Sequence, residues 1–444
     1  MHVPVVTGLS RTSLQKPISN LKLTMYFIVQ VTLLCTLGVA NAFSGDRHFN
    51  QLKQALAGEQ KRGLFLAKVA GNQTDCKQVQ EVIDAQDFEY SPSSQVISVH
   101  DICFVSFRIP SPQRRRTDVE FVKQLPKVEY LENLVFTHAQ SSQVSGCFPS
   151  IRFPWSSCQP RSWGLDRIDQ PNLPLNKKPF HPVYTGVGVT IYTLDTGINK
   201  EHQDFGGRAN LGADFVNEGF VEDRNGHGTH CAGTAAGKEY GVAKDAVIVA
   251  VKVLSQTGIG KTDSLLYGLG WAVEHARDVP AVINLSVGVS TKSRAVDEAV
   301  NAASRAGHIV VVAAGSDGED ACGRSPSGTG KVGPLGGVIS VGATDKNDQR
   351  SPLSNHNCTD IYAPGIDISS LWIGSAQATR RRSGTSVAAA HVSGVAAMLL
   401  QKHNMQKEMA QKEMFSIAAQ NQITNLTKPD EARFKNLLLQ IPRL

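Results

Sequence analysis

The sequence predicts an α/β fold in which a doubly wound, mostly parallel sheet carries helices on both faces, with a small α+β domain preceding it. Apolar strand-like runs alternate with helical stretches through the second half of the chain, which is the pattern of a doubly wound sheet. Those runs are continuously apolar, and such strands are typical of a parallel sheet that helices cover on both sides. Before them, short strand-like runs mixed with helical stretches predict the smaller domain.

The smaller domain is predicted from four short runs rich in β-branched and aromatic residues. We expect strands at Phe65–Val69, Val96–Val99, Phe104–Ile109 and Val128–Leu131, and helices at Cys76–Ala85 and Asp118–Leu125. Strands and helices that mix in this way predict one sheet with helices packed on it.

The larger domain is predicted from apolar runs separated by segments with helical spacing. We expect strands at Gly188–Leu194, Val247–Leu254, Val282–Val287, Ile309–Ala314 and Val338–Ala343, and helices at Ser264–Arg277, Arg294–Arg305 and Lys407–Ala419. A further, strongly apolar helix is predicted to begin near Ser386 and to run through Leu400. Neither a sequence repeat nor a low-complexity block interrupts this pattern.

Composition limits the classes of function. The 444 residues are 41% hydrophobic, an ordinary value for a globular protein with a sizeable core, and the formal net charge is +6. Because this charge is spread along the chain, it indicates neither a nucleic acid nor a membrane surface as a partner.

A leader is predicted near the start of the sequence. Met25–Val39 is an apolar stretch followed by small residues that end at Ala42, which is the pattern of a secretory signal cleaved after Ala42. The alternative is an N-terminal anchor helix, for which the stretch is short. We therefore assign residues 1–42 to a signal region, with translation starting at Met1 or Met25, and expect a secreted, extracellular protein.

Three glycine-rich blocks carry the side chains of a nucleophilic hydrolase. YTLDTGI, NGHGTHCAGT and SGTSVAAAH hold Asp195, His227 and Ser386 in that order. A serine hydroxyl needs an imidazole to take its proton, and a carboxylate that holds this imidazole in the correct tautomer. Asp195 ends a predicted strand, where open α/β sheets place their sites. Ser386 opens a helix, whose N-terminal N–H groups favour negative charge. The blocks therefore predict a catalytic triad.

These blocks resemble those of the subtilisin-like serine peptidases, which share the order Asp, His, Ser. The phrases HGTHCAGT and DACGRSPS point to the proteinase K branch. The resemblance implies that residues 141–444 have a subtilisin-like fold with an N-terminal arm, and that the protein is a monomeric serine endopeptidase acting on peptides or proteins. It also implies that residues 43–140 are a propeptide that assists folding, inhibits the cleft and is cut off by the enzyme itself after Gln140. An ordinary accessory domain is the alternative for residues 43–140.

Cysteine usage favours disulfides. Of eight cysteines, seven remain once Cys35 leaves with the leader, and no Cys-x-x-Cys zinc pattern occurs. Connectivity cannot be deduced from spacing alone. We pair Cys76 with Cys103, Cys147 with Cys158, and Cys322 with Cys358, the last because related enzymes resemble this chain there. The resemblance leaves Cys231 as a free thiol beneath His227. A buried packing residue is the favoured interpretation of that thiol.

By the same resemblance, two segments line the primary specificity pocket and a third pairs with the substrate backbone as an added strand. The pocket residues are Ser286, Val287, Gly288, Ala313, Ala314 and Gly315, and the pairing segment runs from Gly258 to Gly260. Such small and apolar walls favour apolar or aromatic substrate side chains. Val289 stands where relatives commonly have glycine, which narrows a neighbouring subsite.

One position departs from the resemblance at the expected oxyanion site. Relatives usually have an asparagine after Ala-Ala-Gly, whose amide stabilises the oxyanion, and this chain has Ser316. Losing a preorganised donor weakens the transition state more than substrate binding. Serine is shorter but still a donor, and the Ser386 N–H is the second donor. We therefore expect an active enzyme with reduced turnover.

A second function class stays open. Ala390 stands where many relatives have proline, and this run and the FTHAQ tail resemble proprotein convertase subtilisin/kexin type 9, which cuts its own propeptide and then binds a receptor. The alternative is a binding protein on a peptidase scaffold that cuts itself at most once and stays inhibited by its propeptide. The intact triad favours an active peptidase, and Ser316 favours the alternative.

Calcium and surface modification complete the expectations. The chemistry needs no cofactor, but the family often binds structural calcium, and Asp360 matches a position used in proteinase K-like relatives. A solvated or helix-capping carboxylate is the alternative, because calcium takes about six to eight oxygen ligands. Sequons at Asn72, Asn357 and Asn425 are compatible with glycosylation. Arg114–Arg116 and Arg380–Arg382 are interpreted as solvated loops in preference to processing sites.

Overall fold

The computed structural model describes residues 63–86, 94–109, 115–141, 161–289, 291–329, 337–426 and 436–442. Two predictions made from the sequence lie outside these residues. They are the leader with its cleavage position at Ala42, and the disulfide between Cys147 and Cys158. Within the described residues, no helix combines the length and the apolar character that a membrane span requires.

The described part of the N-terminal region is a small α+β unit, as predicted. Its strands are β1 (Leu64–Val69), β2 (Gln95–Val99), β3 (Ile102–Arg108) and β4 (Val128–Asn133), which form an antiparallel sheet in the order β2-β3-β1-β4. Its helices are α3 (Gln73–Asp84) and α4 (Arg115–Lys123). The predicted disulfide between Cys76 and Cys103 is confirmed and joins α3 to β3. Apolar residues of α3, β1 and β3 form a core of their own.

The larger unit is built on a mostly parallel sheet, which confirms the predicted fold class. Nine strands of the described residues follow the order β17-β18-β14-β13-β12-β10-β6-β8-β7, and the β17–β18 pair alone is antiparallel. They are β6 (Thr190–Asp195), β7 (Ala209–Asp214), β8 (Val247–Lys252), β10 (Val282–Leu285), β12 (Ile309–Ala313), β13 (Ile339–Thr344), β14 (Ile361–Pro364), β17 (Ala419–Gln420) and β18 (Leu437–Leu438).

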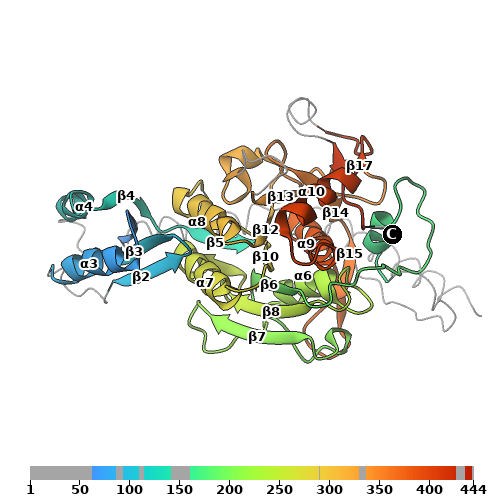
Figure 1. Cartoon of the computed structure of the whole chain (residues 1–444), viewed down its shortest axis with the longest axis horizontal. Helices are drawn as coiled ribbons and strands as arrows, with labels where there is room; N and C mark the ends of the chain where they lie inside the picture. The colour runs from blue at the N-terminus through green and yellow to red at the C-terminus, as the bar shows by residue number, and fades with distance from the viewer. Residues whose placement is uncertain are drawn as a thin grey trace, which may run out of the picture. The chain divides into compact units, whose positions relative to one another are not determined.

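Helices cover both faces of this sheet, as Figure 1 shows. One core packs against α6 (His227–Ala236), α9 (Thr385–Lys402), α10 (Lys407–Ile417) and the short α5 (Trp163–Ile168). The opposite core packs against α7 (Thr262–His275) and α8 (Arg294–Arg305). Helix α9 is buried from Thr385 to Leu400, which fits a sequence that is apolar around its whole circumference.

The chain changes direction across the sheet at β6. From β6 it builds β8 and β7 on one side, and then crosses to β10, β12, β13 and β14 on the other side. Open α/β sheets bind ligands outside the carboxyl ends of the strands at such a switch point. Asp195 is the last residue of β6 and therefore lies at this point.

Strand β5 (Phe136–Ala139) links the two units. It leaves the small sheet after β4 and pairs antiparallel with both β9 (Ile259–Lys261) and β11 (Val287–Val289). The small sheet packs against α7 and α8, and Leu66, Ile97 and Phe104 join the same core as those two helices (Figure 1). A hydrophobic core shared in this way fixes the small unit to the larger one.

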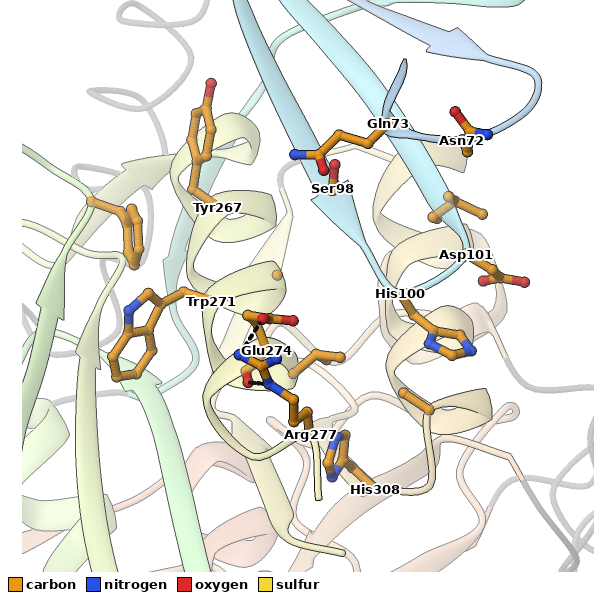
Figure 2. A pocket seen from close by; sticks show the side chains of 15 residues that line it. Asn72, Gln73, Ser98, His100, Asp101, Tyr267, Trp271, Glu274, Arg277 and His308 are labelled. Carbon is orange, nitrogen blue, oxygen red and sulfur yellow. Dashed lines mark hydrogen bonds and ion pairs between the residues drawn. The ribbon is translucent and has the colours of Figure 1, made fainter. Parts of the chain in front are cut away.

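A cavity of about 720 Å³ remains at this junction. Figure 2 shows Trp271 and Glu274 on helix α7, and His100 and Asp101 on the turn between β2 and β3. An ion pair of 2.8 Å between Arg305 and Asp101 bridges the two units beside the cavity. The junction therefore combines an apolar core with a polar, hollow rim.

Some elements were not predicted. Strand β7 is as long as its neighbour β8, but its sequence ANLGAD lacks a continuous apolar run, and β14 has only four residues. The interpretation of Arg380–Arg382 as a loop is wrong, because these residues belong to β16 (Thr379–Arg382), which pairs with β15 (Ile368–Leu371). Arg380 and Arg381 are exposed, as predicted, whereas Arg382 is buried. Three arginines in a row carry no hydrophobic signal, so pairing with the neighbouring strand decides this structure.

Candidate active site

The carboxylate and the imidazole of the predicted triad are in contact. Asp195 at the end of β6 and His227 at the start of α6 are both buried. His227 Nδ1 lies 2.7 Å from Asp195 Oδ1 and 2.9 Å from Oδ2. A carboxylate in this position fixes the tautomer that leaves Nε2 free to accept a proton.

A loop before α6 holds the histidine in place. Gly226 adopts the left-handed conformation with φ +100°, and a Cβ there would lie 2.4 Å from the ring of Trp372. The buried carboxylate of Asp223 accepts hydrogen bonds from the backbone N–H groups of Gly226 and Thr229 and from the Thr196 hydroxyl. Sequence reasoning missed Asp223. An aspartate a few residues before a predicted helix start was the available signal.

Ser386, the third member of the predicted triad, is the second residue of α9. Its Oγ donates to the carbonyl oxygen of Ser286 at 3.2 Å, and the Ser286 hydroxyl donates to the Ser386 carbonyl at 3.0 Å. In the described structure no hydrogen bond joins Ser386 Oγ to His227. Cys231 Sγ lies 3.9 Å from His227 Nε2 and also 3.9 Å from the Ser386 carbonyl oxygen, so the thiol packs beneath both residues. Cys231 is buried and unpaired, as predicted.

Electrostatics in the site favour a protonated imidazole. Burial has the largest single effect and lowers the pKa of His227, but the Asp195 carboxylate and the Cys231 sulfur together raise it by more. The net pKa is therefore well above the ordinary histidine value. An imidazole whose cation is stabilised in this way can accept a proton from a weakly acidic hydroxyl.

The tail that follows β5 enters the site. The carbonyl oxygen of Gln140 accepts hydrogen bonds from the Ser386 N–H at 3.2 Å and from the Ser316 hydroxyl at 3.0 Å. Gly384 permits this approach, because a Cβ there would lie 2.4 Å from the Gln140 oxygen. The carbonyl group of the Gln140–Ser141 peptide is thus held by two donors beside the predicted nucleophile Ser386.

Thr385 orients the Ser316 hydroxyl. The Thr385 N–H donates to Ser316 Oγ at 3.0 Å, and the two hydroxyl oxygens are 3.1 Å apart. Because Ser316 Oγ accepts from this N–H, its own proton is available for the Gln140 oxygen. Serine therefore reaches the carbonyl despite being shorter than asparagine. Thr385 was not singled out from the sequence, since a hydroxyl next to the nucleophile has no distinguishing pattern.

The side chain of Gln140 is recognised as well. Its Oε1 accepts the Ser316 N–H at 2.9 Å, and its Nε2 lies 3.0 Å from a ring nitrogen of His138. Gly288 leaves room for this amide, because a Cβ at Gly288 would lie 1.7 Å from Gln140 Nε2.

The residues expected to bind substrate surround β5. Gly260 pairs with Thr137, Gly258 accepts the Ala139 N–H at 3.2 Å, and Val287 pairs with Ala139. Ser286 accepts the Gln140 N–H at 3.2 Å. Ala313 and Ala314 are buried at the end of β12, and Gly315 follows them with φ +112°. The structure thus pairs the first two predicted segments with β5 and Gln140, and places the third, Ala313–Gly315, directly before Ser316.

Asn284 positions Ser286 through hydrogen bonds, and sequence reasoning missed it as a functional residue. Its amide donates to Ser286 Oγ at 2.9 Å, and its Oδ1 accepts from Ser393 on α9 at 2.9 Å. A polar side chain inside an apolar strand was the available signal, because buried polar groups need partners.

The geometry around Asp360 gives little support for calcium. Its Oδ2 accepts the Ser340 N–H at 2.8 Å, and burial raises its pKa to about 7. A single carboxylate supplies at most two of the six to eight oxygens that calcium takes. Among the described residues, the sole group of three or more His, Cys, Asp or Glu side chains close enough for one ion is Asp195, His227 and Cys231. The predicted disulfide between Cys322 and Cys358, beside Asp360, is confirmed.

Comparison with known proteins agrees with the geometry. The model of the subtilase family matches residues 186–434, which is more than half of the chain. The chain belongs to the subtilase family. This subtilase is 46% identical over 245 residues to the extracellular serine proteinase of Thermus sp. strain Rt41A, a match that covers 54% of the chain and 57% of the relative. It is also 40% identical over 289 residues to the subtilisin-like serine protease Rho m 2.0101 of Rhodotorula mucilaginosa, covering 62% of the chain and 78% of the relative.

A solved structure supports the same fold. The crystal structure of a cold-adapted subtilisin-like serine proteinase matches with a TM-score of 0.58 and 40% identity, covering 64% of this subtilase and 98% of that chain. The matches span 57% of the Thermus proteinase and 44% of the alkaline serine exoprotease A of Vibrio alginolyticus, so about half of each relative is covered.

Proposed function

We propose that this subtilase is a serine endopeptidase that first cuts its own chain between Gln140 and Ser141. The observation that carries the proposal is the position of the Gln140 carbonyl, whose oxygen is held by the Ser386 N–H and the Ser316 hydroxyl. Donors arranged around a carbonyl oxygen stabilise the charge that develops on it during acyl transfer.

In this mechanism the Ser386 hydroxyl turns from the Ser286 carbonyl toward His227. Nε2 takes the hydroxyl proton while Oγ bonds to the carbonyl carbon of Gln140, and the carbonyl oxygen becomes an oxyanion. Asp195 stabilises the imidazolium that forms. Collapse of the intermediate breaks the C–N bond, and His227 gives its proton to the amine of Ser141. Water then attacks the ester in the same way and releases the carboxylate of Gln140.

Residues 43–140 act as a propeptide in this proposal, and residues 141–444 as the peptidase domain. Support comes from β5, which lies between β9 and β11 where an extended substrate would add a strand. The small and apolar cleft also suits other peptide substrates. The expectation of reduced turnover is kept, because Ser316 replaces an amide donor with a hydroxyl.

Secretion is part of the proposal. The predicted leader and the two disulfides in the described residues fit an oxidising compartment, and the Thermus relative is named an extracellular proteinase. Structural calcium also stays a proposal; it rests on the family, whose members often bind it, and Asp360 is the one ligand named for it.

A second function is favoured by the same strand. Because β5 is hydrogen-bonded on both edges and the small unit shares a core with α7 and α8, the cut propeptide can stay in the cleft. The protein would then cleave itself once and act as an inhibited binding scaffold.

Expression of the full chain and of Ser386→Ala separates these functions. We expect the parent chain, but not the variant, to yield a fragment whose N-terminus is Ser141. Hydrolysis of casein and labelling by a fluorophosphonate after propeptide removal support the endopeptidase. Cleavage without either activity supports the binding scaffold, and absence of cleavage refutes both.

A further inference from the structure

Arg382 places a buried positive charge beside the bond that is cut. It is the last residue of β16, four positions before Ser386, and 6% of its surface is exposed. Its Nη2 donates to Ser141 Oγ at 2.6 Å. Ser141 is the residue that follows the Gln140 carbonyl, so the guanidinium contacts the first side chain on the leaving side.

No carboxylate pairs with this guanidinium in the described structure. Its Nε is buried without a hydrogen-bond partner, and burial lowers the pKa of Arg382. The two carboxylates whose charge acts on Arg382 are Asp195 and Asp223, and both are engaged elsewhere. Asp195 binds His227, and Asp223 binds the loop before α6. Burying a charge without a partner costs folding free energy. Arg382 is therefore expected to have a function that offsets this cost.

Aromatic packing holds the guanidinium in position. Arg382 lies 5.4 Å from the centre of the Trp372 ring, and Arg380 lies 4.7 Å from the same ring. Trp372 also contacts His230 edge to face at 6.3 Å. Two cations on one ring make this side of the cleft positive, and the ring fixes the direction of the guanidinium fork.

We propose that Arg382 forms a subsite for the residue after the cut bond and selects aspartate or glutamate there. The inference rests on the proposed peptidase function and adds a substrate class to it. A serine uses one donor of the guanidinium, whereas a carboxylate accepts two N–H groups and supplies the missing counter-charge. Lysine or arginine at the same position meets a like charge and is selected against.

Self-cleavage of the full chain tests this without an added substrate. Ser141→Asp and Ser141→Lys chains are pulse-labelled, and the first-order rate of cutting after Gln140 is measured for each. We expect the Ser141→Asp chain to be cut at least about tenfold faster than the Ser141→Lys chain, the effect of one charge-assisted hydrogen bond. Equal rates, or faster cutting of the lysine variant, overturn the proposal. A parent chain that is never cut refutes the proposed function instead.

Variants on β16 assign the preference to one arginine. Arg382→Met should bring the two rates to within about twofold, and Arg382→Glu should reverse their order. Arg381→Met is the matched control, because Arg381 lies on the same strand but is exposed and pairs with Asp367 at 3.1 Å. In an Arg381→Met background, the Ser141→Asp chain should still be cut at least about tenfold faster than the Ser141→Lys chain. A ratio that survives in a folded Arg382→Met chain overturns the proposal, and the neutral Arg382→Gln replaces this variant if it does not fold.

Discussion

Replacing Ser316 with alanine removes one of two donors that hold the Gln140 carbonyl. The hydroxyl is 3.0 Å from the oxygen, and the Ser386 N–H at 3.2 Å remains. Losing one such donor costs about 10²–10³ in rate, or roughly 2.7–4 kcal/mol, a magnitude that comes from the oxyanion asparagine of subtilisin and not from these distances. Because the Ser386 N–H remains in place, we expect Ser316→Ala to slow self-cleavage by about 10²-fold, the lower end of that range.

The assay is the first-order rate of propeptide cleavage in the full chain, followed by kcat and KM of the mature enzyme on a peptide. The loss should fall on kcat with KM nearly unchanged, since the bond strengthens only as the oxyanion forms. Ser316→Asn should raise kcat by at least about tenfold, because it restores the longer amide donor that relatives usually have at this position.

Stability provides the control for this variant. Ser316→Ala also leaves the Thr385 N–H without its acceptor, which costs about 1–3 kcal/mol of folding free energy. Urea unfolding measures that cost separately from the rate. An unchanged cleavage rate in a folded Ser316→Ala chain would refute the reasoning, because the Ser386 N–H would then suffice alone.

Three further predictions concern the propeptide and pH. Glu132 accepts the Ser293 hydroxyl at 2.6 Å at the start of α8, so Glu132→Gln should speed release of the cut propeptide by about tenfold or more, measured by gel filtration, while the exposed Glu129→Gln should not. Burial lowers the pKa of His391 to about 4, so the stability tied to neutral His391 is present above pH 6.5 and is lost as pH falls toward 4. The free energy of unfolding, measured in urea at pH 7 and pH 5, should change less with pH in His391→Asn than in the parent chain. An equal change in both chains would contradict this prediction. Asp195 raises the pKa of His227, so peptide hydrolysis should increase from neutral into alkaline pH, and a fall over that range would count against His227 as the base.

Periodicity and motif order were sufficient for the scaffold and for the positions of the triad. Strand β12 and helix α8 were predicted almost to the residue. A short, continuous apolar run predicts a buried strand, and apolar residues at helical spacing predict an amphipathic helix. The order of strands around β6 depends on pairings distant in sequence, which no local pattern encodes. Arg382 shows the same limit at the site. Its burial comes from Trp372 and the Gln140–Ser141 tail, which lie close to it only in the folded chain.

In the function proposed for this subtilase, catalysis and inhibition rely on the same contacts. After the cut, Gln140 ends in a carboxylate, and its negative charge suits the Ser386 N–H and the Ser316 hydroxyl at least as well as the carbonyl did. The backbone bonds of β5 to β9 and β11 do not involve the broken peptide, and neither does the core shared with α7 and α8. Cutting removes only the leaving side, where Ser141 met Arg382. In the proposed function, release of residues 43–140, more than bond cleavage, therefore governs when the site becomes available to another chain.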